Sequence, residues 1–145
     1  MPNVDAEIAA RLRLAATRLH RQLRREAGVD LTPSQISALA AIDNHGPLTL
    51  GSLAEHENVS APSITKVTAV LERDGLVERK ADPADRRVQY VSATKDGSEL
   101  VAESRRRKTA WLTSRIHELS PEQRRQLSDA LDVLETITQK DLLAQ

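Results

Sequence analysis

The chain has 145 residues, a length that suits one domain with one core. Basic and acidic residues balance at 21 each, so the net charge identifies no partner, and the absence of cysteine excludes disulfides, thiolate metal sites and cysteine-based redox sensing. No apolar run is long enough for a signal peptide or a membrane span, so we expect a cytoplasmic protein without membrane association.

Helical periodicity begins close to the start of the chain. Apolar residues recur at three- and four-residue steps and predict a helix over residues 5–27, which Gly28 ends. The apolar positions of this helix are Ile8, Leu12, Ala15, Leu19 and Leu23. Thr32, Pro33 and Gln35 form the pattern of a capped helix start, and Gly46-Pro47 ends this second helix.

Two short helices are predicted next, over residues 50–57 and 60–73, with a turn of only a few residues between them. This spacing is typical of a helix-turn-helix. Asn58 stands where the turn usually has a glycine, and asparagine tolerates the left-handed backbone that such a turn requires. We expect Val59 and Ile64 to fill the junction between the two helices.

A β-hairpin is predicted directly after the second of these helices. The segments 76–80 and 87–91 alternate like strands, and a loop containing Asp-Pro-Ala-Asp connects them. A long helix from Thr94 to about Ile116 follows, and a final helix begins at the cap Ser120-Pro121.

The predicted fold is therefore mainly α with a small β-hairpin wing (α+β), as one domain over residues 1–145. Its winged helix-turn-helix part covers residues 32–92. The amphipathic ends, residues 1–28 and 94–145, form a helical part. Its apolar faces could fold back on their own chain, but we expect them to be buried against a second copy.

The helix 60–73 has the faces of a DNA recognition helix. Ile64, Val67, Thr68 and Leu71 share the side that faces the core at 100° per residue, and the opposite side is small, polar and lightly basic. The predicted DNA contacts are Ser60, Ala61, Pro62, Ser63, Thr65, Lys66 and Arg73. Lys66 would donate to guanine in the major groove, although a solvated lysine is an equal alternative. For Arg73 we expect a phosphate or a neighbour such as Glu72 rather than a base.

The hairpin tip carries the second predicted DNA contact, made of Asp85, Arg86 and Arg87. Arginine is favoured in a narrow minor groove, where the negative potential is concentrated. Residues two apart share a strand face, so we expect Asp85 to hold the guanidinium of Arg87 extended. Arg86 points elsewhere and suits a phosphate.

These patterns together resemble the MarR family of winged helix-turn-helix regulators. The segments that carry the resemblance are "LTPSQISAL", "LAEHENVSAPSITKVTAVLERDGLVER" and "DPADRRVQYVSATKDG". The family's wing often reads Asp-x-Arg-Asp-x-Arg, and Ala84 here removes the side chain for one expected wing contact or internal ion pair.

The resemblance implies a homodimer, built from the first and the last two helices, that binds double-stranded DNA. Its two recognition helices would read a pseudo-palindromic operator with half-sites about one helical turn (~10 bp) apart. Many relatives are repressors that release DNA when a small, often aromatic acid binds between the dimerisation helices and the winged domain. We therefore expect a repressor with a small-molecule effector, whose pocket the sequence does not locate.

Other polar clusters have simpler interpretations. We expect the basic run 105–108 to be a solvated helix face that forms ion pairs with Glu99 and Glu103. The four histidines are scattered, so we expect neither a metal site nor a cofactor. Trp111 suits core or dimer packing, and the wall of a pocket is the alternative.

Other functional classes compete with the regulator. An enzyme is the least supported, because the sequence contains no phosphate loop, no nucleophile–base pair and no carboxylate pair in a plausible pocket. The alternatives that stay open are a winged-helix module that binds another protein, and a regulator without a small-molecule effector.

Overall fold

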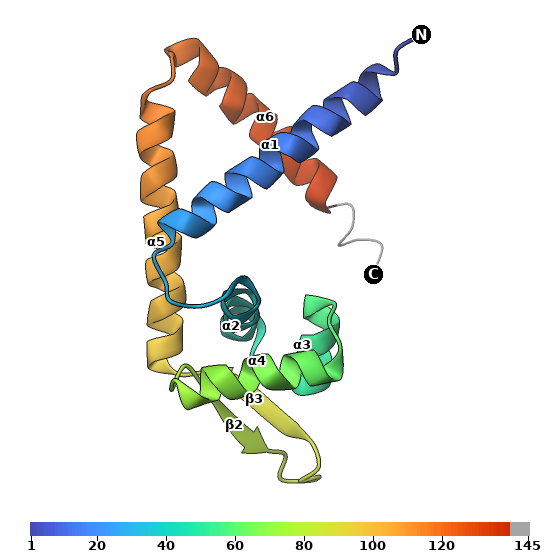
Figure 1. Cartoon of the computed structure of the whole chain (residues 1–145), viewed down its shortest axis with the longest axis vertical. Helices are drawn as coiled ribbons and strands as arrows, with labels where there is room; N and C mark the ends of the chain where they lie inside the picture. Colours follow the sequence, from blue (N-terminus) through green and yellow to red (C-terminus); the bar gives the residue numbers. More distant parts are fainter. Residues whose placement is uncertain (140–145) are drawn as a thin grey trace. The chain divides into compact units, whose positions relative to one another are not determined.

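The computed structural model describes residues 1–139, and its helices and short sheet confirm the predicted fold class (Figure 1). The elements are α1 (Val4–Glu26), α2 (Pro33–His45), β1 (Leu48–Thr49), α3 (Leu50–Glu57), α4 (Ala61–Arg73), β2 (Val77–Ala81), β3 (Gln89–Ala93), α5 (Lys95–His117) and α6 (Pro121–Gln139). The chain divides into two compact units, the first of which is residues 1–108. The end of the predicted dimerisation part, residues 140–145, lies outside the described residues.

The helix starts follow the predicted capping residues. Thr32 and Gln35 form a reciprocal capping box: the Thr32 hydroxyl accepts the Gln35 N–H at 3.3 Å and the Gln35 amide oxygen accepts the Thr32 N–H at 3.0 Å. Ser120 and Gln123 repeat this arrangement at the start of α6. Asn58 adopts the left-handed conformation, with φ of 53°, that the short turn between α3 and α4 requires.

The sheet has three antiparallel strands in the order β1-β3-β2, rather than the two of the predicted hairpin. The additional strand is β1, in which Leu48 pairs with Val91. The predicted strand boundaries were also wrong: β3 begins at Gln89, two residues later than expected. The physical reason is a turn in which the Val88 N–H donates to the carbonyl of Asp85 at 3.0 Å, so the preceding residues belong to the loop.

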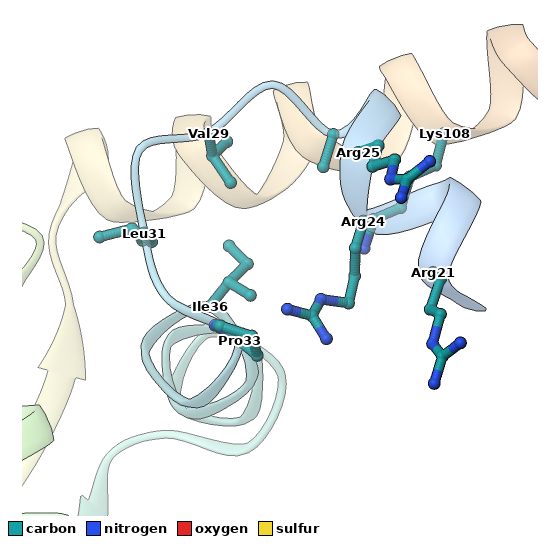
Figure 2. Close-up of a pocket in the computed structure, with 9 residues that line it drawn as sticks. Arg21, Arg24, Arg25, Val29, Leu31, Pro33, Ile36 and Lys108 are labelled. Carbon is teal, nitrogen blue, oxygen red and sulfur yellow. The ribbon is translucent and has the colours of Figure 1, made fainter. Parts of the chain in front are cut away.

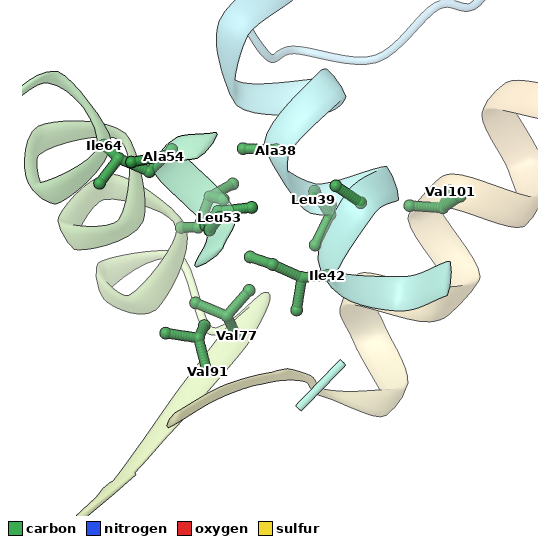
Figure 3. Close-up of a cluster of buried hydrophobic side chains, with 11 residues drawn as sticks. Ala38, Leu39, Ile42, Leu53, Ala54, Ile64, Val77, Val91 and Val101 are labelled. Atoms are coloured by element: carbon green, nitrogen blue, oxygen red, sulfur yellow. The ribbon is translucent and has the colours of Figure 1, made fainter. Parts of the chain in front are cut away.

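The core lies within the winged part of the chain, where α2, α3, α4, the sheet and the first turns of α5 meet (Figure 3). Its largest fully buried side chains are Leu39, Ile42, Leu53, Ile64, Leu71, Val91 and Thr68. The hydroxyl of Thr68 donates to the carbonyl of Ile64 at 2.7 Å, and this bond makes burial of a polar side chain tolerable.

The expectation that Val59 fills the junction between α3 and α4 was wrong. Its side chain is 42% exposed, whereas Ile64 is buried and small Ala54 lets the helices approach. Packing of the helices explains the difference, because Val59 lines a cavity between α2 and α4 instead of closing the junction.

The terminal helices behave differently from the winged part, since neither α1 nor α6 buries a residue within the described chain. Their exposed large apolar residues are Val4, Ile8, Leu12, Leu14 and Leu19 on α1, and Leu127, Leu131, Val133 and Ile137 on α6. In the described residues, no helix combines the length and the apolar character needed to cross a membrane.

Candidate nucleic-acid interface

The outer face of α4 is open to a partner. Each predicted contact residue is exposed, namely Ser60, Ala61, Pro62, Ser63, Thr65, Lys66 and Arg73. The opposite face supplies Ile64, Thr68 and Leu71 to the core, as the helical periodicity predicts. The helix is thus fixed by its buried side and presents a narrow polar surface.

Hydrogen bonds at the start of α4 determine whether its hydroxyl groups can donate to or accept from a partner. Ser60 accepts the N–H of Ser63 at 3.3 Å and donates its own hydroxyl to Ser63 Oγ at 2.9 Å. The hydroxyl proton of Ser63 is therefore available for an external acceptor such as a phosphate oxygen. Thr65 donates to the carbonyl of Ala61 at 2.9 Å, so toward a partner its oxygen acts as an acceptor.

The two cations of α4 differ in their surroundings. Arg73 Nε forms an ion pair with Asp74 Oδ1 at 3.1 Å, which is an acidic neighbour in the chain as expected, although it is not Glu72 itself. In the described part of the chain, Lys66 forms no ion pair with any carboxylate. Among residues 1–139, no carboxylate neutralises the charge of Lys66, so this cation is available to a partner.

The wing loop is held by its own backbone bonds. Asp82 Oδ1 accepts the N–H groups of Ala84 and Asp85 at 2.7 and 3.4 Å, which forms an Asx turn. The Asp82 N–H donates to the carbonyl of Val88 at 2.8 Å and closes the loop at its base. The tip is thus a defined turn and not an open connection, and it leaves the predicted contact Arg86 exposed.

Asp85 and Arg87 pair at this tip as predicted, but for a different reason. The Arg87 Nε and Nη2 donate to the two carboxylate oxygens of Asp85 at 3.1 and 3.2 Å, and the Arg87 backbone N–H donates to Asp85 Oδ1 at 3.1 Å. The pair lies in a turn and not on one strand face. The side-chain and then the backbone bond from Arg87 lower the pKa of Asp85. The Arg87 side chain stays 91% exposed, so the pair fixes the guanidinium without covering it.

An ion pair that the sequence did not predict connects the wing to α4. Arg79 of β2 reaches Glu72 in the last turn of α4, and the Arg79 side chain is only 24% exposed. A signal was present, because Arg79 lies two residues after Val77 and therefore on the same strand face as that buried side chain.

The basic run on α5 is largely a solvated face, as expected. Arg106 and Arg107 form ion pairs with Glu103. The hydrogen bonds from both arginines lower the pKa of Glu103, and the bond from Arg106 has the larger effect. The expected pairing with Glu99 was wrong, because Glu99 faces Lys95 one turn before it. Trp111 is half-buried, and Arg115 lies 5.5 Å from its ring centroid, which is packing within one helix.

The histidines are less scattered than the sequence suggested, because the ring centroids of His45 and His56 lie 5.0 Å apart. Two imidazoles are fewer ligands than a structural metal site uses. Among residues 1–139, no group of three or more histidine, cysteine or carboxylate side chains is placed to bind a metal ion.

A cavity of about 270 Å³ lies where α1 ends and the loop to α2 begins (Figure 2). Its lining combines four cationic side chains with an apolar group, namely Arg21, Arg24, Arg25 and Lys108 with Ala27, Val29, Leu31, Pro33 and Ile36. Figure 2 shows Arg24 extending toward the space beside Ile36. Within the described chain no carboxylate lines this cavity, so it suits a small anion with an apolar body.

Comparison with known proteins agrees with this geometry. The MarR family profile matches residues 31–88. An HTH-type transcriptional regulator of Mycobacterium tuberculosis is 41% identical over 135 residues, which cover 92% of this chain and 94% of the relative. A solved structure from Pseudomonas aeruginosa is 35% identical with a TM-score of 0.86, covering 96% of this chain and 99% of that one.

The fold also matches that of a protein solved with DNA. Staphylococcus aureus MepR, in a mutant form bound to an oligodeoxyribonucleotide, is 21% identical with a TM-score of 0.72, covering 91% of this chain and 98% of MepR. At this identity the match shows the shared fold alone. The profile match and the mycobacterial relative, which aligns with nearly the whole chain, place this protein in the MarR family of DNA-binding, winged helix-turn-helix transcriptional regulators.

Proposed function

We propose that this regulator is a homodimeric, sequence-specific repressor that a small acid releases from its operator. The observations that carry the proposal are the exposed polar face of α4 and the exposed Arg87 of the wing, which Asp85 orients. In the proposed complex, α4 lies in the major groove, where Lys66 donates to guanine and Ser63 to a phosphate. Arg87 enters the adjacent minor groove.

The terminal helices support the dimer. Both terminal helices expose apolar residues, Ile8 and Leu19 on α1 and Leu131 and Ile137 on α6. Full burial of a leucine or isoleucine side chain is worth about 1.5–3 kcal/mol. A second copy would cover such faces. Two-fold symmetry then presents two α4 helices to a pseudo-palindromic operator with half-sites about 10 bp apart.

The cavity at the end of α1 is the proposed effector site. A carboxylate there would be attracted by Arg21, Arg24 and Lys108, and an aromatic body would contact Val29 and Ile36. The wall formed by the loop between α1 and α2 connects the cavity to the winged part of the chain. An acid that binds more tightly to the DNA-free conformation would shift the population away from DNA.

Genomic footprinting of the tagged full chain, with and without candidate aromatic acids, tests this function. We expect protected sites with two-fold sequence symmetry, and loss of protection when the effective acid is added. If the sites are protected but no acid releases the protein from them, DNA binding stands and the proposed acid effector is contradicted. A complete lack of protected sites would contradict sequence-specific repression.

A further inference from the structure

A second cavity, of about 350 Å³, lies between the start of α2 and the helix-turn-helix formed by α3 and α4. Its lining is Pro33, Ser34, Ser37, Glu57, Val59, Ser63, Ile64 and Val67. The volume is within the range of small-molecule sites. It shares no residue with the arginine-lined cavity except Pro33.

The apolar part of this cavity is held in place by the backbone. The N–H of Val59 donates to the carbonyl of Ala54 at 3.0 Å, so the backbone of this exposed valine is held at the rim of the cavity. Ile64 is buried in the floor and Val67 is half-buried beside it. An apolar ligand group here would remove the exposed surface of Val59 from water.

The electrostatic character of the cavity is set by Glu57. This half-buried carboxylate accepts a hydrogen bond from the Ser37 hydroxyl at 2.7 Å through Oε2, and it forms no ion pair in the described residues. No basic side chain of residues 1–139 lines the cavity. The surrounding segment, residues 29–59, contains four acidic residues and neither lysine nor arginine.

We propose that this cavity binds a small organic cation that has an apolar body. The ammonium group lies against the Oε1 oxygen of Glu57, and the hydroxyl oxygens of Ser34 and Ser63 can accept its remaining hydrogen bonds. The apolar body covers Val59 and Val67. This site is chemically opposite to the proposed effector cavity, and its occupation does not depend on an acid binding there.

The position of Ser63 gives the site a consequence for regulation. Ser63 belongs to the first turn of α4 and is bonded to the N-cap Ser60, so a bound cation would occupy the Ser63 hydroxyl that the proposed complex uses for a phosphate. An effect of the cation on DNA binding rests on the proposed DNA-binding surface, whereas binding of the cation to the cavity does not.

Amide-resolved NMR titration of the full chain without DNA tests the site. The probes are benzylammonium, the neutral isostere benzyl alcohol, and benzoate. We expect benzylammonium to shift the amides of Ser37, Val59 and Ser63 and to bind at least about fivefold more tightly than benzyl alcohol, because only the cation forms a charge-assisted bond with the carboxylate. Benzoate, repelled by Glu57, should not shift these amides.

Matched variants assign the selectivity. Glu57→Gln keeps an acceptor for Ser37 and should remove the preference for the cation, whereas Glu55→Gln, at an exposed site of the same helix outside the cavity, should retain it. Val59→Ala should weaken the binding of both ligands alike. Equal binding of amine and alcohol to the unaltered protein, or shifts confined to other regions, would overturn the proposal even if Glu57→Gln failed to fold. The NMR titration contains no DNA, so its outcome does not depend on whether the protein binds an operator.

Discussion

Arg79 of β2 and Glu72 of α4 form an ion pair between the wing and the recognition helix. The pair links the two elements that the proposed function places in neighbouring grooves. Since the Arg79 side chain is largely covered and that of Glu72 is 47% exposed, solvent screens the interaction on one side only.

Reversing the charges of this pair should reveal their coupling. Arg79→Glu places two carboxylates together and should lower the free energy of unfolding, and adding Glu72→Arg should recover much of the loss. We expect a coupling energy on the order of 1 kcal/mol from urea unfolding of the two single variants and the double variant. A double variant whose loss equals the sum of the single losses would show that the two side chains do not interact.

Removal of the braced wing arginine should weaken DNA binding. We expect Arg87→Ala to reduce operator affinity at least about tenfold (~1.4 kcal/mol), because it removes the proposed minor-groove contact. Fluorescence anisotropy with a footprinted operator measures the loss, and gel filtration should show an unchanged oligomeric state. Unaltered affinity would count against the wing contact.

The salt dependence of operator binding reports the number of phosphate contacts. If α4 and the wing of both copies reach the backbone, log affinity should fall with log salt concentration with a slope on the order of −4 or steeper. The same anisotropy assay over a salt series provides this slope. A flat response would exclude the proposed phosphate contacts.

The pairing at the wing tip should depend on pH in one direction. Because Arg87 lowers the pKa of Asp85 in the folded chain, the pair stabilises the wing above the unfolded-state pKa of aspartate. This stabilisation is lost as the pH falls through the lowered pKa. Carbon-detected NMR can follow the titration of the Asp85 carboxyl, and its pH midpoint should be lower in the unaltered protein than in Arg87→Ala. Equal midpoints in the two proteins would show that Arg87 does not stabilise the Asp85 carboxylate.

Two glycines should respond oppositely to alanine. A Cβ at Gly97 would overlap the carbonyl oxygen of Leu76, so Gly97→Ala should cost about 1–3 kcal/mol of unfolding free energy. A Cβ at helical Gly51 meets nothing within 4 Å in the described chain, so Gly51→Ala should be neutral or stabilising by up to about 1 kcal/mol. Thermal unfolding of both variants compares them, and a stable Gly97→Ala would contradict this close approach.

Features that depend on neighbours in the chain were predictable from the sequence. The cap at Thr32 and the left-handed turn at Asn58 involve groups only a few residues apart, so local composition is sufficient to specify them. The buried face of α4 follows from the helical period. The pairing of Asp85 with Arg87 was predicted, but the turn that brings the two side chains together was not.

Features that join distant segments were decided by the tertiary structure. Strand β1 is two residues long and exists because β3 lies beside it, which no local pattern indicates. The position of Val59 on a cavity rim, rather than in the core, depends on how α2 and α4 approach each other. By itself the sequence determined which helices form, which face of α4 is buried and which residues cap them, because hydrogen bonds and periodicity act over about three or four residues. Only tertiary packing decided the third strand, the ion pair of Arg79 with Glu72 and the two oppositely charged cavities, because each requires surfaces that meet only when the core has formed.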